Sequence, residues 1–214
     1  DRPRRIELTS YAEVVLNARA ADITHPAFSK LFVQTEWVAE QRALLARRRS
    51  RAVGEPVCWL VHALIGDGDQ TEQPCYETDR AQFIGRGYSL AAPKALVETG
   101  PWSGTVGNVL DPIVSLRRTV ELAAGGEARI TFLLGAAADR ASARALAARY
   151  AESATVEAAF RAAAGQYPLP DPVFSSVGET RPVPPSPASD ADASPTALPA
   201  DDEPLQFWNG HGGF

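Results

Sequence analysis

An all-β sandwich is the fold that this sequence predicts for residues 1–138, and three observations predict it. Residues 6–16 alternate between apolar or small and polar side chains, which is the period of a strand with one buried face. Residues 57–65 are apolar on both faces, as in a strand that is covered from both sides. Residues 113–122 alternate again, and turns rather than helical patterns separate these segments, which favours a sandwich.

The first three strands are predicted in order along the chain. Residues 6–16 place Tyr11 and Glu13 on the polar face of the first strand. Residues 31–38 are rich in β-branched and aromatic side chains, which predicts a second strand. Residues 41–48 predict a third strand, although their Ala-Leu-Leu-Ala centre would also suit a helix.

Two turn signals organise the later strands. The strand over 57–65 stops at Gly66-Asp67-Gly68-Asp69, a strong turn sequence. Gly125-Gly126 joins the alternating residues 113–122 to a further strand over 128–134. We therefore expect these last two strands to form a hairpin and to pair with each other.

A helical period replaces the strand period after residue 138. Asp139 is suited to cap a first helix, and Ser153 or Thr155 a second one that stops at Gly165. Their apolar stripes are Ala143, Leu146, Ala147 and Tyr150 in the first, and Val156, Ala159, Phe160 and Ala163 in the second. We expect this helical appendage, 139–165, to pack against the edge of the sandwich.

Residues 166–204 predict a disordered linker. Ten of the 17 prolines lie there, with seven acidic residues and a single Arg, and such a composition buries too little apolar surface to fold. The aromatic- and Gly-rich residues 205–214 predict the first strand of a further β-domain. Because Met is also absent from position 1, we expect the chain to be a piece of a longer polypeptide.

Charge and composition exclude several classes of function. The net charge is −5, and the acidic linker accounts for it, so the remaining body is close to neutral and a poor binder of nucleic acid. No apolar run reaches the ~20 residues of a membrane span, so no direct membrane insertion is expected. Cys58 and Cys75 are too few for a disulfide framework or a four-ligand zinc site, and we expect neither a metal nor a cofactor.

The densest polar cluster is Glu77-Thr78-Asp79-Arg80, followed by Gly85-Arg86-Gly87. Carboxylates at i and i+2 share a face of an extended chain, as a general acid and base could. The favoured alternative is structural. In it, an ion pair of Asp79 with Arg80, or of Glu77 with Arg86, holds a loop in place. The glycines lack the strand and helix of a phosphate-binding loop, which excludes a nucleotide site.

Aromatic, histidine and arginine residues give weaker signals. Trp37 and Trp102 are suited to stack on sugar rings, whereas Trp59 lies in a predicted buried strand. No Ser-His-Asp or Cys-His arrangement is evident, and His62 is expected in the core. The arginine-rich run 47–51 is interpreted as a solvated turn.

Several motifs, in order, carry a resemblance to a known family. They are Ile6–Leu16, His25–Glu36, Ala43–Ala46 with Arg48 and Arg51, Tyr76–Arg80, Phe83–Gly87, Ser103–Gly107, Leu110–Pro112 and Ser115–Arg118. Over about residues 1–165 they resemble the β-supersandwich region of the cyclic β-1,2-glucan synthases, large bacterial membrane enzymes whose C-terminal half is similar to glycoside hydrolase family 94. Residues 205–214 resemble the segment that opens the next β-domain of that family.

The resemblance implies a mainly β, galactose-mutarotase-like supersandwich that is incomplete in this chain. It also implies that the catalytic acid belongs to an (α/α)6 barrel outside these residues, so no catalytic residue is expected here. It further implies work on β-1,2-linked glucan by a larger membrane protein, with this region on the cytoplasmic side of the bacterial inner membrane.

We therefore expect a non-catalytic module that binds β-1,2-glucan weakly or braces the absent barrel. The candidate carbohydrate contacts are Tyr11, Glu13, Trp37, Glu77, Asp79, Arg80 and Arg86. Four of them, Tyr11, Glu13, Trp37 and Arg80, are expected to lie exposed on a sheet face. The alternatives are a purely structural scaffold, which would show buried aromatics or an exposed apolar patch, and an enzyme that uses Glu77 and Asp79.

Overall fold

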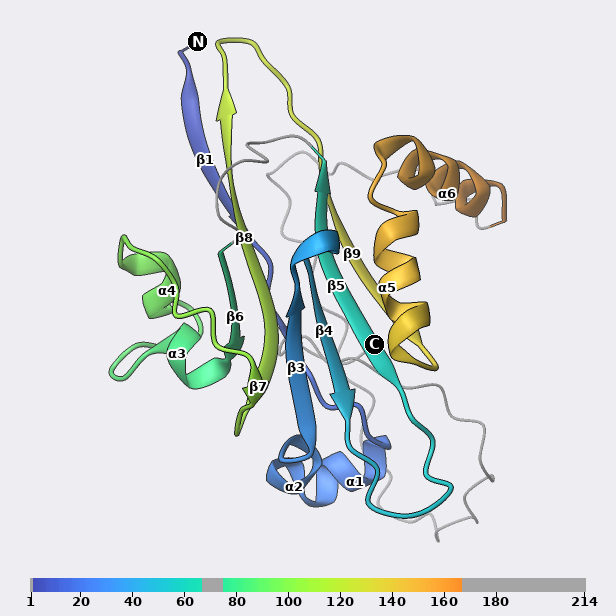
Figure 1. Ribbon diagram of the computed structural model, residues 1–214. Coiled ribbons are helices and arrows are strands. Elements are labelled where there is room, and N and C mark those ends of the chain that lie inside the picture. The colour runs from blue at the N-terminus through green and yellow to red at the C-terminus, as the bar shows by residue number, and fades with distance from the viewer. Residues whose placement is uncertain (1, 67–74, 167–214) are drawn as a thin grey trace, which may run out of the picture.

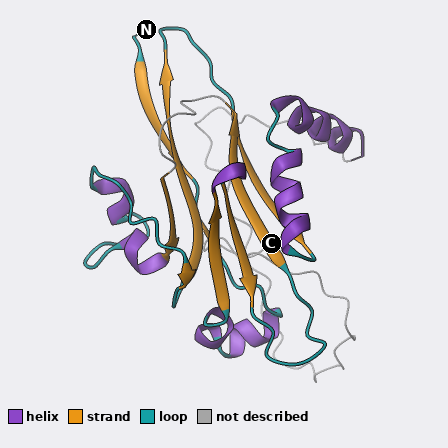
Figure 2. Cartoon of the chain, in the orientation of Figure 1, coloured by secondary structure: helices purple, strands orange, loops and turns teal. Residues whose placement is uncertain are grey.

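The computed structural model describes residues 2–66 and 75–166 of the chain. Two antiparallel sheets pack face to face in this part, and short helices lie around them (Figures 1 and 2). The mainly β fold predicted from the sequence is confirmed. The predicted strand over 205–214 and, except for residue 166, the predicted linker over 166–204 lie outside the described residues.

One sheet is built around a long central strand. Its strands are β1 (Arg4–Thr9), β2 (Ala12–Glu13), β6 (Cys75–Asp79) and β8 (Pro112–Leu122). Both β1 and β2 pair with β8 in a single register, so they are two pieces of the strand predicted over 6–16. The interruption falls at Ser10, whose side-chain Oγ accepts a hydrogen bond from the backbone N of Leu116 at 3.0 Å.

The other sheet has five strands in the order β7-β3-β4-β5-β9. They are β3 (Val33–Val38), β4 (Ala43–Arg48), β5 (Trp59–Gly66), β7 (Gly107–Asn108) and β9 (Ile130–Ala137). The predicted strands over 31–38 and 57–65 are confirmed. Residues 43–48 form a strand and not a helix, since their apolar centre lies between β3 and β5 and is buried on both faces.

The predicted hairpin of residues 113–122 with 128–134 is wrong. Strand β8 pairs with β1, β2 and β6, whereas β9 pairs with β5 in the opposite sheet. Gly125 does turn the chain, with a φ of 71°. A turn sets the direction of the chain but not its partner, and residues 123–129 lead from one sheet to the other (Figure 1).

The main core lies between the two sheets. It consists of Val14, Leu16, Val33, Leu44, Ala46, Leu60, Leu64, Val114 and Leu116. A second apolar layer lies on the outer face of the five-stranded sheet and includes Trp59, which is buried as predicted. Because both faces of this sheet are covered, β5 is buried along almost its whole length.

The two predicted helices are present as α5 (Arg140–Arg149) and α6 (Ser153–Gln166). Asp139 caps α5 by accepting a hydrogen bond from the Ser142 N at 2.8 Å. Ala143 and Ala147 are buried in the second apolar layer, so α5 covers the face of the sheet and not the expected edge. Small side chains allow this close approach. Helix α6 continues through Gly165, which had been expected to end it.

Short helices among the strands are a further correction, because none was expected there. They are α1 (Arg19–Thr24), α2 (Pro26–Lys30), the 3-10 turn η1 (Ala39–Gln41), α3 (Arg80–Ile84) and α4 (Lys94–Val97). Helices of four to six residues are too short to show a helical period in the sequence. In Figure 1, α1 and α2 lie at the lower end of the sandwich, and α3 and α4 lie beside the sheet of β8.

Candidate functional site

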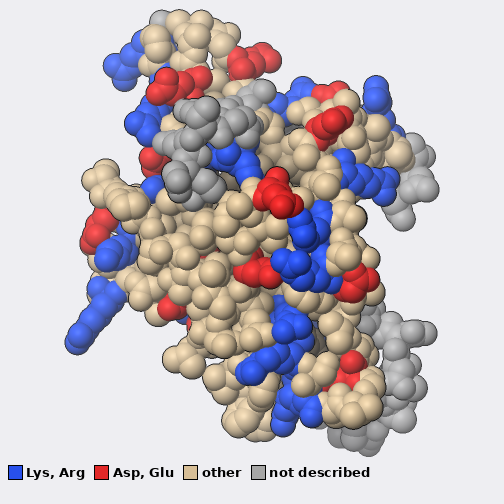
Figure 3. Space-filling view, viewed as in Figure 1, with Lys and Arg blue, Asp and Glu red and all other residues tan. Residues whose placement is uncertain are grey.

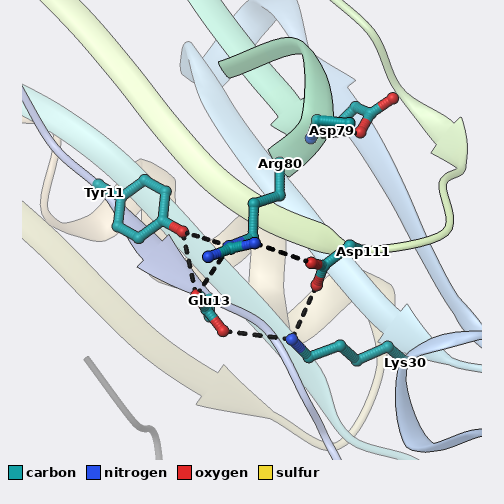
Figure 4. Close-up of polar contacts among 7 residues, drawn as sticks. Tyr11, Glu13, Lys30, Asp79, Arg80 and Asp111 are labelled. Carbon is teal, nitrogen blue, oxygen red and sulfur yellow. Dashed lines mark hydrogen bonds and ion pairs between the residues drawn. The ribbon is translucent and has the colours of Figure 1, made fainter. Parts of the chain in front are cut away.

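Three of the seven predicted contact residues meet in one polar cluster (Figure 4). Strand alternation places Tyr11 and Glu13 on the outer face of the sheet of β8, and Arg80 is the first residue of α3. Lys30, at the end of α2, and Asp111, directly before β8, complete the cluster. Sequence reasoning missed these two residues.

The four charged residues form a closed ring of ion pairs. Glu13 accepts hydrogen bonds from Arg80 Nε at 3.0 Å and from Lys30 Nζ at 3.2 Å. Asp111 accepts from Lys30 Nζ at 2.7 Å and from Arg80 Nη1 at 3.4 Å. The Tyr11 hydroxyl accepts from Arg80 Nε and donates to Glu13 Oε1, both at 3.1 Å. We call Glu13, Lys30, Arg80 and Asp111 the ion-pair ring.

Burial and charge set the protonation states in the cluster. Burial, and then the charge of Glu13, raise the pKa of Tyr11 to about 12. Burial lowers the pKa of Lys30, but its hydrogen bond to Asp111 and the charge of Glu13 outweigh this effect and raise it overall. Tyr11 is therefore neutral and Lys30 charged at neutral pH, so neither is poised for acid–base chemistry.

The geometry of the ion-pair ring indicates a structural role, because its charged groups bond to one another. All four carboxylate oxygens of Glu13 and Asp111 accept a hydrogen bond from Lys30 or Arg80. These groups use their bonding capacity internally, and Glu13 is only 9% exposed. The expected open sheet face is therefore wrong for this cluster, because α2 and α3 cover it.

The Trp37 side chain also packs within the protein. Its ring stacks on Tyr76, with centroids 4.5 Å apart and an angle of 12° between the planes. Both rings pack against the main core, and they come from opposite sheets, β3 and β6. The expectation that Trp37 lies exposed is wrong, because Tyr76 occupies a face of the ring that a sugar would need.

Glu77 and Asp79 do not face a common site. A β-bulge between them breaks the alternation of β6. Glu77 is 2% exposed, accepts from the backbone N of Thr78 and of Asp79 at 2.9 Å, and accepts from the Ser103 hydroxyl. Asp79 caps α3 by accepting from the Ala81 N at 2.9 Å.

The two alternative ion pairs are not found either. Within residues 2–66 and 75–166, Arg80 pairs with Glu13 and Asp111, and not with Asp79. Arg86 is exposed and forms no ion pair with Glu77 in this part of the chain. The loop is instead held by Glu77 through the backbone that follows it and through Ser103.

A groove beside α3 and α4 brings an aromatic ring next to polar side chains. It holds about 370 Å³ and is lined by Glu77, Gln82, Phe83, Lys94, Ala95, Glu98, Thr99, Gly100, Pro101, Trp102 and Ser103, a size within the ~300–1,000 Å³ of small-ligand pockets. Trp102 is half-buried and donates from Nε1 to the Ala95 carbonyl at 3.2 Å. We call this hollow the α3–α4 groove.

Phe83 connects the α3–α4 groove to the ion-pair ring. It lines the groove and packs on Tyr11, which is hydrogen-bonded to Arg80 and Glu13. The Phe83 ring lies 5.0 Å from the Tyr11 ring and 5.5 Å from the Trp102 ring, measured between centroids. Arg80 and Phe83 both belong to α3. The ion pairs of Arg80 therefore help to hold Phe83, and with it one side of the groove, in place.

A contact between Ser10 and the buried His62 was not predicted from the sequence. The Oγ of Ser10 lies 2.7 Å from His62 Nε2, and His62 Nδ1 lies 2.9 Å from the Leu133 carbonyl. Burial lowers the pKa of His62 to about 4. His62 is 4% exposed, so the pair links the two sheets and is not open to a substrate. The two residues lie 52 positions apart, and no local pattern joins them.

The described residues offer little support for a metal site, a disulfide or a membrane-spanning helix. No group of three or more His, Cys, Asp and Glu side chains there is arranged to hold a metal ion. Both Cys58 and Cys75 are free and half-buried. No helix in the described part combines the length and the apolar character that a membrane crossing requires.

Comparison with known proteins supports the resemblance drawn from the motifs. A family model described as glycosyl hydrolase 94, supersandwich domain, matches residues 1–153. The curated cyclic beta-(1,2)-glucan synthase NdvB of Rhizobium meliloti (strain 1021) is 41% identical over 137 residues, which are 64% of this chain. Those residues span only 5% of that relative's own length.

Proposed function

The chain belongs to the glycosyl hydrolase 94 supersandwich domain family, and we propose that it is a non-catalytic supporting module of a protein that acts on β-1,2-glucan. The substrate class follows from the name of the curated relative, a cyclic beta-(1,2)-glucan synthase. The chain aligns with only a small part of that protein. The proposed partner is the helical barrel that the family resemblance implies.

An exposed apolar groove between α6 and β9 carries the proposal. It is lined by Ile65, Thr131, Phe132, Leu133, Tyr150, Val156, Ala159, Phe160 and Ala163. Phe132 is 47% exposed and Phe160 is 68% exposed. Contiguous exposed apolar side chains mark docking surfaces. Strand β9 is the last strand in the order of its sheet, so the groove lies at a sheet edge that α6 leaves partly open.

The use of the aromatic side chains also supports a scaffold. Trp37 and Tyr76 stack on each other across the sheets, and Tyr11 packs on Phe83. A surface that binds sugar by stacking needs open ring faces, whereas these rings fill the interior.

A chimeric synthase tests the supporting role. Residues 2–166 would replace the aligned region of the Rhizobium meliloti protein, and cyclic β-1,2-glucan formation per molecule of folded protein would be measured. We expect the chimera to be active and the double variant Phe132→Ser/Phe160→Ser to lose at least tenfold, because a barrel would no longer dock. Leu96→Ser/Val97→Ser, a matched pair of exposed apolar residues on α4, should keep its activity. Equal activity of all three chimeras would contradict the proposal.

The α3–α4 groove favours a second candidate function, weak contact with glucan. Sugar sites in proteins commonly combine an aromatic face with charged and amide groups, and here Trp102 lies with Gln82, Lys94 and Glu98. Calorimetric titration of the whole chain with β-1,2-linked gluco-oligosaccharides tests it. Millimolar binding that is lost in Glu98→Ala and retained in Glu127→Ala, an exposed control, would support the candidate. No heat of binding at any oligosaccharide length would contradict this second candidate and leave only the supporting role.

A further inference from the structure

Exposed apolar and basic side chains lie together on the elements that form the lower end of the molecule, in the orientation of Figure 1. It is formed by α1, α2 and the loop over residues 49–58 that joins β4 to β5. The apolar side chains there, each at least 40% exposed, are Ile23, Phe28, Leu31, Val53 and Val57. We call this surface the basic-apolar end.

Arginines surround an aromatic ring at this end. The guanidinium carbons of Arg48, Arg49 and Arg51 lie 5.7, 6.0 and 5.0 Å from the centroid of the Phe32 ring. The backbone N of Arg49 donates to the Phe32 carbonyl at 2.8 Å. Phe32 comes directly after Leu31 and α2. The loop is therefore fixed against α2, and the arginines are held beside the exposed apolar side chains.

The charge balance of the basic-apolar end is positive. Arg48 forms an ion pair with Glu55, whose other oxygen accepts from the backbone N of Arg51 at 2.6 Å. The residues Arg49 and Arg51 are themselves exposed. In Figure 3, Lys and Arg side chains gather toward the lower end of this face, among uncharged side chains.

We infer that the basic-apolar end binds the surface of an anionic lipid bilayer without crossing it. Arginines near a membrane are attracted to anionic headgroups, and apolar side chains beside them enter the boundary between headgroups and acyl chains. A soluble phosphate or an acidic peptide would use the arginines but would gain little from Phe28 and Val53. Val53 stands clear of the protein and Phe28 is 58% exposed, which is what favours the lipid surface.

Vesicle co-sedimentation of the full 214-residue chain tests this inference. The probes are vesicles of phosphatidylcholine alone and vesicles with 30% phosphatidylglycerol, at low and at physiological salt. We expect binding to the anionic vesicles only, and weaker binding at higher salt. Arg49→Glu/Arg51→Glu should lower the partition coefficient at least tenfold, and Phe28→Ser/Val53→Ser at least threefold. The charge-matched control, Arg149→Glu/Arg161→Glu on α5 and α6, should stay within twofold of the wild type.

Three results would overturn the inference. Equal binding to both kinds of vesicle would remove the role of the headgroup charge. An equal loss in Arg149→Glu/Arg161→Glu would mean that net charge matters and the basic-apolar end does not. Binding of soluble polyglutamate that Phe28→Ser/Val53→Ser leaves unchanged, together with no gain on phosphatidylglycerol, would assign the surface to an acidic protein segment.

Discussion

At the scale of single residues, His62 brings a pH dependence into the core. Its pKa falls from 6.5 to about 4 because the imidazole is buried. Between these two pH values the unfolded chain binds a proton at this residue and the folded chain does not. His62 therefore leaves the free energy of unfolding unchanged above pH 6.5. As the pH falls toward 4, protonation of the unfolded chain lowers this free energy by about 3 kcal/mol, at ~1.4 kcal/mol per pKa unit.

Urea denaturation at several pH values between 7.5 and 4.5 measures this effect. The free energy of unfolding of the wild type should fall more steeply with acid than that of His62→Gln, which has no titrating group at this position. His25→Gln alters an exposed histidine between α1 and α2 and should follow the wild-type slope. Parallel slopes for the wild type and His62→Gln would show that His62 titrates normally in the folded chain.

The ion-pair ring predicts a cost for removing a single charge. Glu13→Gln keeps the shape of the side chain but leaves Lys30 and Arg80 with one carboxylate partner in the ring, Asp111. Arg80 and Asp111 are about one-third exposed, so we expect a loss of about 1–3 kcal/mol, below the value for fully buried pairs. Guanidinium denaturation measures it, and the exposed Glu127→Gln should change stability by less than ~0.5 kcal/mol. A neutral Glu13→Gln would mean that the ring does not stabilise the fold.

Sequence reasoning identified three of the five residues in the polar cluster that Tyr11 forms with the ion-pair ring. Alternation marked Tyr11 and Glu13, and the density of charge marked Arg80. The partners Lys30 and Asp111 lie 17 and 98 positions from Glu13, and only the packing of α2 and of the residues before β8 brings them close. The same packing covers Tyr11 and Glu13, which alternation alone places on an open face, and leaves Arg80 and Asp111 about one-third exposed.

At the scale of elements, the end of α3 depends on a glycine with no room for a side chain. Gly85 has a φ of 81°, and a Cβ there would lie 2.6 Å from the Cβ of Lys94 on α4. Gly87 has a similar φ of 85° but has open space around it. Both positions disfavour other residues by about 1–2 kcal/mol through the backbone, and Gly85 adds a clash.

We therefore expect Gly85→Ala to destabilise the chain by about 1 kcal/mol or more beyond Gly87→Ala. The positive φ is common to both positions, so the difference between the two variants measures what is particular to Gly85, namely its extended ψ of 153° and its contact with α4. Thermal or urea melts of both variants measure it. Equal losses would mean that α4 moves away freely, and the α3–α4 groove would then be pliable.

Elements with a long enough pattern were predicted well, and their pairing was not. Alternation found β8, and continuous apolar character found β5, because each pattern extends over eight residues or more. The strands that pair with β8 are distant in the chain, most of all β1, where Ile6 pairs with Val120, and also β6, where Tyr76 pairs with Leu116. A glycine turn next to β8 carries no such information.

At the scale of the whole molecule, the two sheets share a single core. Val14, Val114 and Leu116 of one sheet pack in the same cluster as Leu44 and Leu60 of the other. The Trp37–Tyr76 stack and the Ser10–His62 contact also cross between the sheets. Neither sheet buries its inner face alone, so we expect the described domain to unfold as one unit.

Leu44→Ala tests this cooperativity, because Leu44 of β4 is fully buried in the main core between the sheets. We expect a loss of about 2–5 kcal/mol from the lost contacts and the cavity. The transition measured by far-ultraviolet circular dichroism, which reports both sheets, should still coincide with that measured by tryptophan fluorescence. Leu110→Ala, at an exposed position before β8, should leave both midpoints unchanged. Two separated transitions in Leu44→Ala would mean that the sheet of β8 keeps its structure without the other sheet, and then a shared core could not be what holds the described residues together as a single domain.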